Sequence, residues 1–319
     1  MTTHATQLDL FDPALTHPPA SARRRRRPRA RRTPRRNELL EVARVALLVA
    51  RRELNDYSCP RSKHTFTQPQ LLACLVLRAY RKLTYRGTSE LLDASDALRE
   101  VLGLTHAPAH TTFKEFERRA VTPTLLDRLV GAVLALLVEA GVVVTEVAVD
   151  STGVETSGAS AHFRTRAKRE RKGYVKLSMC VACTSILLVS LAVSMGPSND
   201  LGDGAREVLW RAAGRCRPDW WLADAAFDAE WFHTFCAASA CGASSHVPPV
   251  PKARDGTVKS GPDRVRCATH TPLNYGRRWH VESFISGMKR TCGSTLAARS
   301  ERALFNEAGL KALAYAVRR

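Results

Sequence analysis

Residues 142–150 read Val-Val-Val-Thr-Glu-Val-Ala-Val-Asp, a run that is rich in β-branched residues and contains no glycine or proline. Such a run is typical of a buried β-strand. It also marks a change of pattern along the chain. Before it, over residues 37–141, apolar residues recur every three or four positions. That spacing predicts about five helices, which are separated at Gly87, at 102–108 and at the start of the last helix, 123–140.

After residue 150 the pattern changes to strands and then to strands that alternate with helices. Two strand-like runs, 174–183 and 186–195, are joined by a short turn and are predicted to pair antiparallel. The next predicted elements are a helix over 203–215, a strand over 220–225, a helix over 228–240 and a short strand over 244–247. Helices are predicted from about residue 275 to the last residue. Such an order makes a mixed sheet that is covered on both faces. We therefore expect an α+β chain, in which an N-terminal helical module precedes an RNase-H-like mixed β-sheet flanked by helices.

The charge of the chain indicates a polyanionic partner. Its 319 residues include 49 Lys and Arg against 30 Asp and Glu, a formal net charge of +19. Ten of the fourteen residues from 23 to 36 are arginine, and they begin with the run Arg23, Arg24, Arg25, Arg26 and Arg27. This segment has no apolar periodicity, so we expect a disordered basic arm that contacts phosphates without sequence preference; a solubilising or targeting tail is the alternative. The first 36 residues hold ten Arg and two Asp, a net of +8, which leaves +11 for the rest.

Other features exclude several classes of protein. The clearest unbroken apolar run, 129–138, has about half the length that a bilayer requires, so no membrane partner is expected. The first residues lack the basic start and apolar middle of a secretory signal, and a cytoplasmic location is expected. The nine cysteines do not suggest a disulfide framework. The pairs Cys180–Cys183 and Cys236–Cys241 are expected to be buried thiols rather than zinc ligands.

Three carboxylates occupy positions that suit the ligands of a hard divalent cation. Asp150 ends the first predicted strand, Asp224 follows a later apolar strand, and Glu282 lies in a predicted C-terminal helix. Acidic side chains at strand ends face a cleft while the sheet fixes their backbone, and two ions held there can clamp the oxygens of a phosphodiester. Taken singly, Asp150 could cap a turn, and Glu282 could be a solvated helical glutamate. Asp228, four residues after Asp224, is the other candidate there, but it is predicted to be a helix N-cap.

The helix that carries Glu282 supports the functional interpretation. On a helix that turns about 100° per residue, Tyr275, Arg278, Glu282 and Lys289 fall within a stripe about 60° wide. A carboxylate with cations on either side can hold a metal ion while the cations bind neighbouring DNA phosphates. A solvated, salt-bridged helix face is the ordinary alternative for such a stripe.

The same four residues match the signature Tyr-x2-Arg-x3-Glu-x6-Lys, through which the chain resembles the bacterial insertion-sequence transposases of the DDE type. Residues 149–153 and 222–224 are similar to the family's two Asp blocks. The segment 84–116 is similar to its N-terminal module, so the resemblance leaves out only the arm. One departure is Ala226-Phe227-Asp228, where the family usually has Gly-Tyr-Asp.

The resemblance implies a DNA transposase that cleaves DNA at the ends of an element and transfers the strand into target DNA. Asp150, Asp224 and Glu282 would be the catalytic residues and would bind two Mg²⁺ ions, or Mn²⁺ in their place. The tyrosine, arginine and lysine of the signature would contact DNA. The partner would be double-stranded DNA, at terminal inverted repeats and at the target, bound by a homodimer in the synapse and close to the nucleoid.

The composition, the sequence pattern and the resemblance together predict three regions: a disordered arm over 1–36, a helical DNA-binding and assembly module over 37–141, and an RNase-H-like catalytic domain over 142–319. Two other functions stay open. One is a DNA-binding relative that has lost catalysis and acts as a regulator. The other is a nuclease of the same fold that acts on RNA hybrids or on DNA junctions.

Overall fold

The computed structural model describes residues 37–61, 63–156, 174–239, 242–250 and 261–319. The predicted arginine arm, with Arg23 to Arg27, lies outside the described residues. From Glu38 to Arg319 the chain forms one compact unit, whose larger buried cluster includes residues of both the helical and the sheet segment.

Six helices, rather than about five, precede the sheet in the described chain: α1 (Glu38–Glu53), α2 (Gln68–Arg81), α3 (Tyr85–Asp93), α4 (Asp96–Leu102), α5 (His110–Ala120) and α6 (Pro123–Glu139). Local signals explain where several of them begin. Thr67 caps α2 through a capping box with Gln70, and Thr122 caps α6. The predicted break at Gly87 is wrong. The hydroxyl of Thr84 caps α3 by accepting a hydrogen bond from the Gly87 amide at 3.0 Å, so this glycine lies in the first turn.

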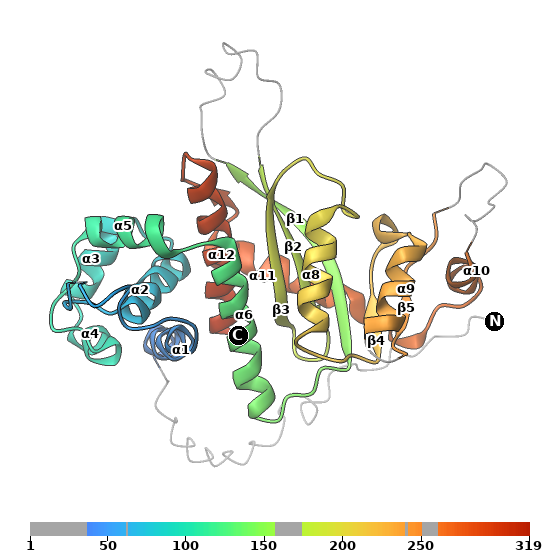
Figure 1. Cartoon of the computed structure of the whole chain (residues 1–319), viewed down its shortest axis with the longest axis horizontal. Helices are drawn as coiled ribbons and strands as arrows, with labels where there is room; N and C mark the ends of the chain where they lie inside the picture. The colour runs from blue at the N-terminus through green and yellow to red at the C-terminus, as the bar shows by residue number, and fades with distance from the viewer. Residues whose placement is uncertain (1–36, 62, 157–173, 240–241, 251–260) are drawn as a thin grey trace, which may run out of the picture. The chain divides into compact units, whose positions relative to one another are not determined.

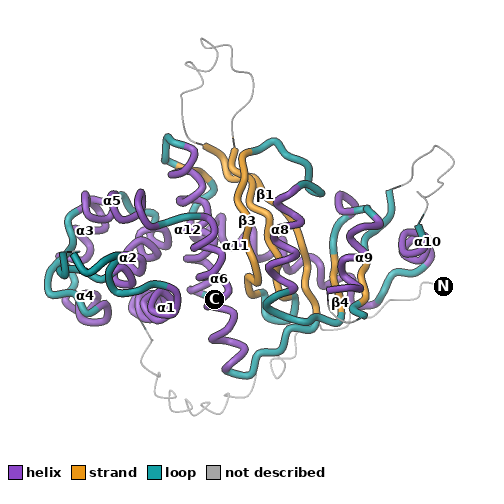
Figure 2. Tube along the Cα trace, in the orientation of Figure 1, coloured by secondary structure: helices purple, strands orange, loops and turns teal. Residues whose placement is uncertain are grey.

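The sheet contains six described strands: β1 (Glu146–Thr156), β2 (Tyr174–Ala182), β3 (Leu187–Met195), β4 (Trp220–Leu222), β5 (Ser244–His246) and β6 (Thr295–Leu296). Their order is β3-β2-β1-β4-β5, and β6 pairs with the last residues of β1. Figure 1 labels β1 to β5, and Figure 2 shows the strands in orange. The pairs β1–β2 and β2–β3 are antiparallel, and the pairs β1–β4, β4–β5 and β1–β6 are parallel. The predicted mixed sheet is therefore confirmed, and β6 is a strand that the sequence did not predict.

The remaining helices follow or interrupt these strands: α8 (Asp203–Ala213), the 3-10 helix η2 (Ala225–Phe227), α9 (Glu230–Ser239), α10 (Pro262–Thr269), the 3-10 helix η3 (Leu273–Arg278), α11 (Trp279–Cys292) and α12 (Glu301–Arg318). Of these, α10 lies between the predicted strand 244–247 and the C-terminal helices, where the sequence predicted no helix. The helices cover both faces of the sheet (Figure 1). Along β2, Met179 and Val181 join the buried cluster of α11 and α12, whereas Cys180 and Ala182 join that of α8 and α9.

The strand that was predicted to end at Asp150 continues beyond it, to Thr156. β1 begins at Glu146, because residues 142–145 form the link from α6, with the Val142 amide bonded to the helix carbonyl of Leu137 at 2.9 Å. It continues through polar residues to Thr156, because these pair with β2 and β6. Asp150 therefore lies inside a strand, opposite Met179, and not at its end.

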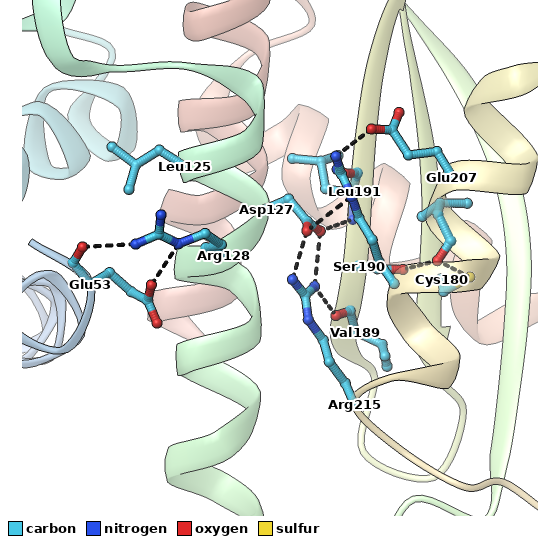
Figure 3. A network of polar contacts seen from close by, with 12 residues as sticks. Glu53, Leu125, Asp127, Arg128, Cys180, Val189, Ser190, Leu191, Glu207 and Arg215 are labelled. Carbon is cyan, nitrogen blue, oxygen red and sulfur yellow. Dashed lines mark hydrogen bonds and ion pairs between the residues drawn. The ribbon is translucent and has the colours of Figure 1, made fainter.

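A buried polar network fastens α6 to β3 and α8 (Figure 3). The Asp127 carboxylate on α6 is 2% exposed. It accepts a hydrogen bond from the Leu191 amide of β3 at 2.9 Å and two from the guanidinium of Arg215, at 2.9 and 2.6 Å. Arg211 on α8 adds a cation 3.5 Å away. α6 belongs to the predicted helical module, yet it packs on β3 of the predicted catalytic domain. The domain boundary between residues 141 and 142 therefore stays a prediction.

Two smaller expectations concern membranes and thiols. Among the described residues, no single helix has the length and apolarity to cross a membrane; α5 and α6 together reach that length only as a pair bent by 95°. Cys180, Cys183 and Cys236 are buried, as predicted. Cys241 lies outside the described residues.

Candidate active site

The register of two parallel strands brings Asp150 and Asp224 to the same side of the sheet. Ala148 on β1 stands opposite Leu222 on β4, and each aspartate follows its strand partner by two residues. Ala148 and Leu222 both belong to the cluster packed by α11. Because side chains alternate along extended backbone, Asp150 shares the face of Ala148, and Asp224, which is extended at φ −83° and ψ 175°, shares that of Leu222. Both aspartates are half-buried.

Glu282 reaches the same face from α11. Val281 and Phe284 on this helix are buried in the cluster that contains Ala148, which fixes the helix against β1 and β2. Glu282 lies in the first turn with its side chain 54% exposed. Its Oε1 accepts a hydrogen bond from Nη2 of Arg278 at 2.6 Å.

The short helix η3 connects this first turn to the strand that precedes Asp224. The Tyr275 hydroxyl donates to the carbonyl oxygen of Ala223 at 3.3 Å. The ring of Tyr275 packs edge-on against His246 of β5, with 4.6 Å between ring centroids. Burial lowers the pKa of His246 to about 4, so this imidazole is neutral near pH 7. Tyr275 therefore helps to position Asp224 through the neighbouring backbone.

Charge repulsion among the carboxylates shows that they lie within electrostatic reach of one another. Burial above all, together with the negative charges of Asp224 and Glu282, raises the pKa of Asp150 to about 6. A hydrogen bond from the Ser151 amide at 2.7 Å and the positive charge of Arg278 act in the opposite direction. Three residues far apart in the sequence thus form one acidic site. Among the described groups that act on Asp150, Arg278 is the one guanidinium.

The donor chemistry of this site fits a hard divalent cation, because all three side chains offer carboxylate oxygens. In their described positions, however, each carboxylate is turned toward a donor of the chain itself: the Ser151 amide, the Ala226 amide at 3.0 Å from Asp224, and Arg278. Accordingly, no three His, Cys, Asp or Glu side chains in the described chain are arranged to hold a metal ion. Binding a cation here requires these side chains to rotate toward one another.

Asp228, the neighbouring acid, has a different role from the N-cap that was predicted. Its carboxylate is buried, bonds to Nε of Arg264 at 2.7 Å and accepts a hydrogen bond from the Val250 amide at 3.0 Å. This ion pair ties α10 to the end of η2, while α9 begins two residues later, at Glu230. The charge of Asp228 is balanced by Arg264. Of the two aspartates, Asp224 is the one whose charge acts on Asp150.

The predicted stripe on one α-helix is only partly present. Tyr275 and Arg278 belong to the 3-10 helix η3, and α11 begins at Trp279. The turn of 100° per residue therefore applies from Trp279 onward only. Lys289 is half-buried in the last turn of α11, about 10 Å along the axis from Glu282. Within the described residues, no hydrogen bond or ion pair joins Lys289 to the three carboxylates.

Sequence reasoning missed one ion pair beside the site. Nη1 of Arg277 lies 2.5 Å from Oε1 of Glu146, which is 9% exposed at its side chain, so the start of β1 is fastened to η3. The signal was present in the sequence, because Glu146 is a charged residue inside an otherwise apolar run. A charge that is buried in a strand requires a partner.

Comparison with known proteins identifies the family. No curated protein matches the chain in a sequence search. Residues 145–317 match the family model of the transposase DDE domain, and they include Asp150, Asp224 and Glu282. Since this match spans more than half of the 319 residues, the chain belongs to the transposase DDE domain family.

Proposed function

We propose that the protein is a DNA transposase that cleaves DNA at the ends of a mobile element and joins the released strand to target DNA. The observation that carries this proposal is the convergence of Asp150, Asp224 and Glu282 on one face of the sheet, where the charges of the other two raise the pKa of Asp150. Clusters of like charge with raised pKa values are typical of functional sites, since a purely structural role gains nothing from such repulsion.

In this proposal the three carboxylates hold two Mg²⁺ ions. When bound, the ions supply charge stabilisation and a water or hydroxyl of lowered pKa for phosphoryl transfer. The contribution of the chain is to place the three backbone positions: Asp150 lies inside β1, Asp224 follows Ala223, whose carbonyl oxygen is bonded by Tyr275, and Glu282 lies on a helix with a buried face. No protein nucleophile is needed, because water and a DNA 3′-hydroxyl are the attacking groups.

Arg278 is proposed to exchange partners when DNA binds. It is 21% exposed and is now held by Glu282. Once Glu282 turns to a cation, the guanidinium becomes available for a phosphate oxygen beside the scissile bond. Lys289, further along α11, is proposed to contact another phosphate of the same strand, and the ring of Tyr275 to pack against the DNA backbone or a displaced base.

The rest of the molecule is proposed to bind and assemble on DNA. A net charge of +19 suits a partner with a dense negative charge. The helical module of residues 37–141 would serve DNA binding and assembly, with the arginine arm adding contacts that do not depend on sequence. Two element ends in one reaction require two copies of the chain, so a homodimer on DNA is proposed.

The test uses the full-length protein and DNA that carries the terminal inverted repeats of its element. Asp150→Asn, Asp224→Asn and Glu282→Gln are expected to abolish Mg²⁺-dependent cleavage while DNA binding is retained. Glu100→Gln, a change of an exposed acid on α4, is the matched control and should cleave normally. Cleavage at the normal rate by any of the three site variants would overturn the triad. Binding without metal-dependent cleavage by the unmodified protein would indicate the non-catalytic relative instead.

A further inference from the structure

Strand β1 is partly uncovered on the face against which α11 packs. Four residues of β1 share this face, because side chains alternate along a strand: Ala148, Asp150, Thr152 and Val154. Ala148 is 0% exposed and Val154 is 1% exposed, and both belong to the buried cluster that contains residues of α11. Asp150 and Thr152, which lie between them, are half-buried. These two positions form an opening over β1, so a ligand that reaches Asp150 from this face also lies beside Thr152.

The sheet is interrupted beside this opening. Along one edge, β1 pairs with β2 from Val147 to Glu155. Along its other edge, β1 pairs with β4 at residues 146–148 and with β6 at residues 155–156. Between these two ladders, residues 149–154 have no strand partner in the described chain. No described strand therefore lies next to Asp150 and Thr152 on that side of the opening.

The hydroxyl group of Thr152 is available to a ligand. Within the described residues it forms no hydrogen bond, although a hydroxyl can donate one hydrogen bond and accept two. The neighbouring hydroxyl of Ser151 is engaged on the opposite face of the strand, where its Oγ lies 3.1 Å from Oγ of Ser178. Thr152 therefore presents an unused donor beside Asp150.

The charges around the opening favour an uncharged donor for a DNA phosphate. The described groups that act on Asp150 include two carboxylates, those of Asp224 and Glu282, and one guanidinium, that of Arg278. A lysine or arginine in the place of Thr152 would pair with these carboxylates and compete with a bound cation. A threonine hydroxyl binds a phosphate oxygen without adding a charge, which is a common contact between proteins and DNA. The residue type at this position therefore suits a phosphate that lies next to bound cations.

The position of Thr152 decides which phosphate it can reach. Thr152 lies two residues beyond Asp150, about 7 Å along β1, and successive phosphates of a DNA strand are spaced on the same scale. We propose that the Thr152 hydroxyl donates a hydrogen bond to the phosphate next to the scissile one and thereby holds the DNA strand in the opening. This inference rests on the proposed function of the three carboxylates. It adds to that function a DNA contact outside the signature residues.

Two substitutions at Thr152 in the full-length protein separate a phosphate contact from a structural role. Thr152→Val removes the hydroxyl and keeps the β-branched shape that a strand favours, so the Tm should not fall. Its Mg²⁺-dependent cleavage of DNA with terminal inverted repeats, measured with DNA below its Kd, should be about tenfold slower, which corresponds to about 1.4 kcal/mol. Thr152→Ser keeps the hydroxyl and should cleave close to the rate of the unmodified protein. A purely structural role predicts the opposite order, because valine suits a strand better than serine.

A neutral phosphate analogue identifies the contact in the DNA. Methylphosphonate is placed in turn at each of the two phosphates that flank the scissile one. At one of these positions the difference in cleavage rate between the unmodified protein and Thr152→Val should disappear, because the analogue and the substitution remove the same contact. A difference that persists with both analogues would overturn the proposal, as would cleavage of ordinary DNA by Thr152→Val at the unmodified rate.

Binding of the same DNA molecules in Ca²⁺ gives a readout that does not depend on cleavage. Ca²⁺, like Mg²⁺, takes carboxylate oxygens as ligands. Thr152→Val should raise the Kd for ordinary DNA, and it should leave unchanged the Kd for the analogue that lacks the contact. Absence of cleavage by the unmodified protein would count against the proposed function. Equal Kd values of Thr152→Val and the unmodified protein for ordinary DNA would instead overturn the phosphate contact.

Discussion

Two groups of charged residues flank the sheet, and they differ in charge balance. At β3, the single carboxylate of Asp127 is surrounded by two guanidinium groups and a backbone amide. At β1 and β4, three carboxylates face one guanidinium, and the pKa of Asp150 is raised to about 6. The first group satisfies its charges internally and has a structural role. The second group has an excess of negative charge that the described side chains leave uncompensated, which is the property expected of a site that takes a cation.

The largest expected effect is on catalysis by the second group, Asp150, Asp224 and Glu282, whose negative charge is not balanced. Asp150→Asn should lower the rate of Mg²⁺-dependent cleavage at least about a thousandfold, since the variant loses a proposed metal ligand. Its Tm, measured in EDTA, should not fall, because the ionised Asp150 is itself destabilised by burial and by its acidic neighbours. A lower Tm together with normal cleavage would show that Asp150 is a structural residue like Asp127.

The pH dependence of stability follows from the same pKa. The pKa of Asp150 rises from 3.8 to about 6 on folding. Between these values the folded state binds more protons than the unfolded state, so the stability that this group contributes falls as pH increases through that window. In EDTA, the difference in Tm between the unmodified protein and Asp150→Asn should therefore move in favour of the variant as pH rises from about 4 to about 6. A difference that is independent of pH would contradict the raised pKa.

At the first group, Asp127 with Arg211 and Arg215, a substitution should change stability and leave catalysis unchanged. Asp127→Asn leaves the guanidinium groups of Arg215 and Arg211 without their carboxylate, and we expect it to lower the free energy of unfolding by about 3 kcal/mol. Cleavage at a temperature where the variant is folded should be unchanged. The control is Arg128→Ala on the same helix, which breaks an exposed ion pair with Glu53 (Figure 3) and should cost less than about 1 kcal/mol. Equal losses of stability in the two variants would refute the distinction.

A smaller effect is expected at Lys289. If this side chain contacts one phosphate, Lys289→Ala should weaken DNA binding and reduce the slope of log K against log salt concentration by about one. The slope is measured by titrating labelled DNA at several salt concentrations, with Arg217→Ala, at an exposed position after α8, as the control for the loss of one charge. An unchanged slope would remove Lys289 from the DNA-binding surface.

The smallest effect is expected at Tyr275. Tyr275→Phe removes the hydrogen bond to the carbonyl oxygen of Ala223 and should lower the free energy of unfolding by about 1 kcal/mol. Affinity for DNA should stay the same, since the ring that is proposed to pack against DNA is retained. Weaker DNA binding at equal stability would mean that the hydroxyl group, rather than the ring, meets the DNA.

The sequence predicts the sheet well where side chains decide the structure. Residues 142–150 are recognisable as strand because β-branched residues favour extended backbone, and the meander of β2 and β3 follows from two apolar runs with a short turn between them. The end of β1 was missed because residues after Asp150 are polar and are held extended by pairing with β2 and β6. Pairing between distant segments leaves no periodic signal in either of them.

The candidate site was predictable in its residues but not in its geometry. The spacing of Tyr275, Arg278 and Glu282 was visible in the sequence, yet their placement on a 3-10 helix and on the first turn of α11 depends on contacts with Ala223 and Glu146. The opening at Asp150 and Thr152 could not be predicted at all. It depends on how α11 packs on β1, and neither segment alone carries a motif for it.

The network around Asp127 also has a consequence for assembly. β3 is a terminal strand of the sheet, and such strands often recruit a strand from another molecule through their free amide and carbonyl groups. Here the Leu191 amide is bonded to Asp127, and the carbonyl oxygens of Val189 and Leu191 accept from Arg215 and Arg211. Extension of the sheet at this edge would have to break all three bonds. The dimer on DNA that is proposed above would therefore use surfaces other than this strand. The same three bonds protect the strand against edge-to-edge aggregation.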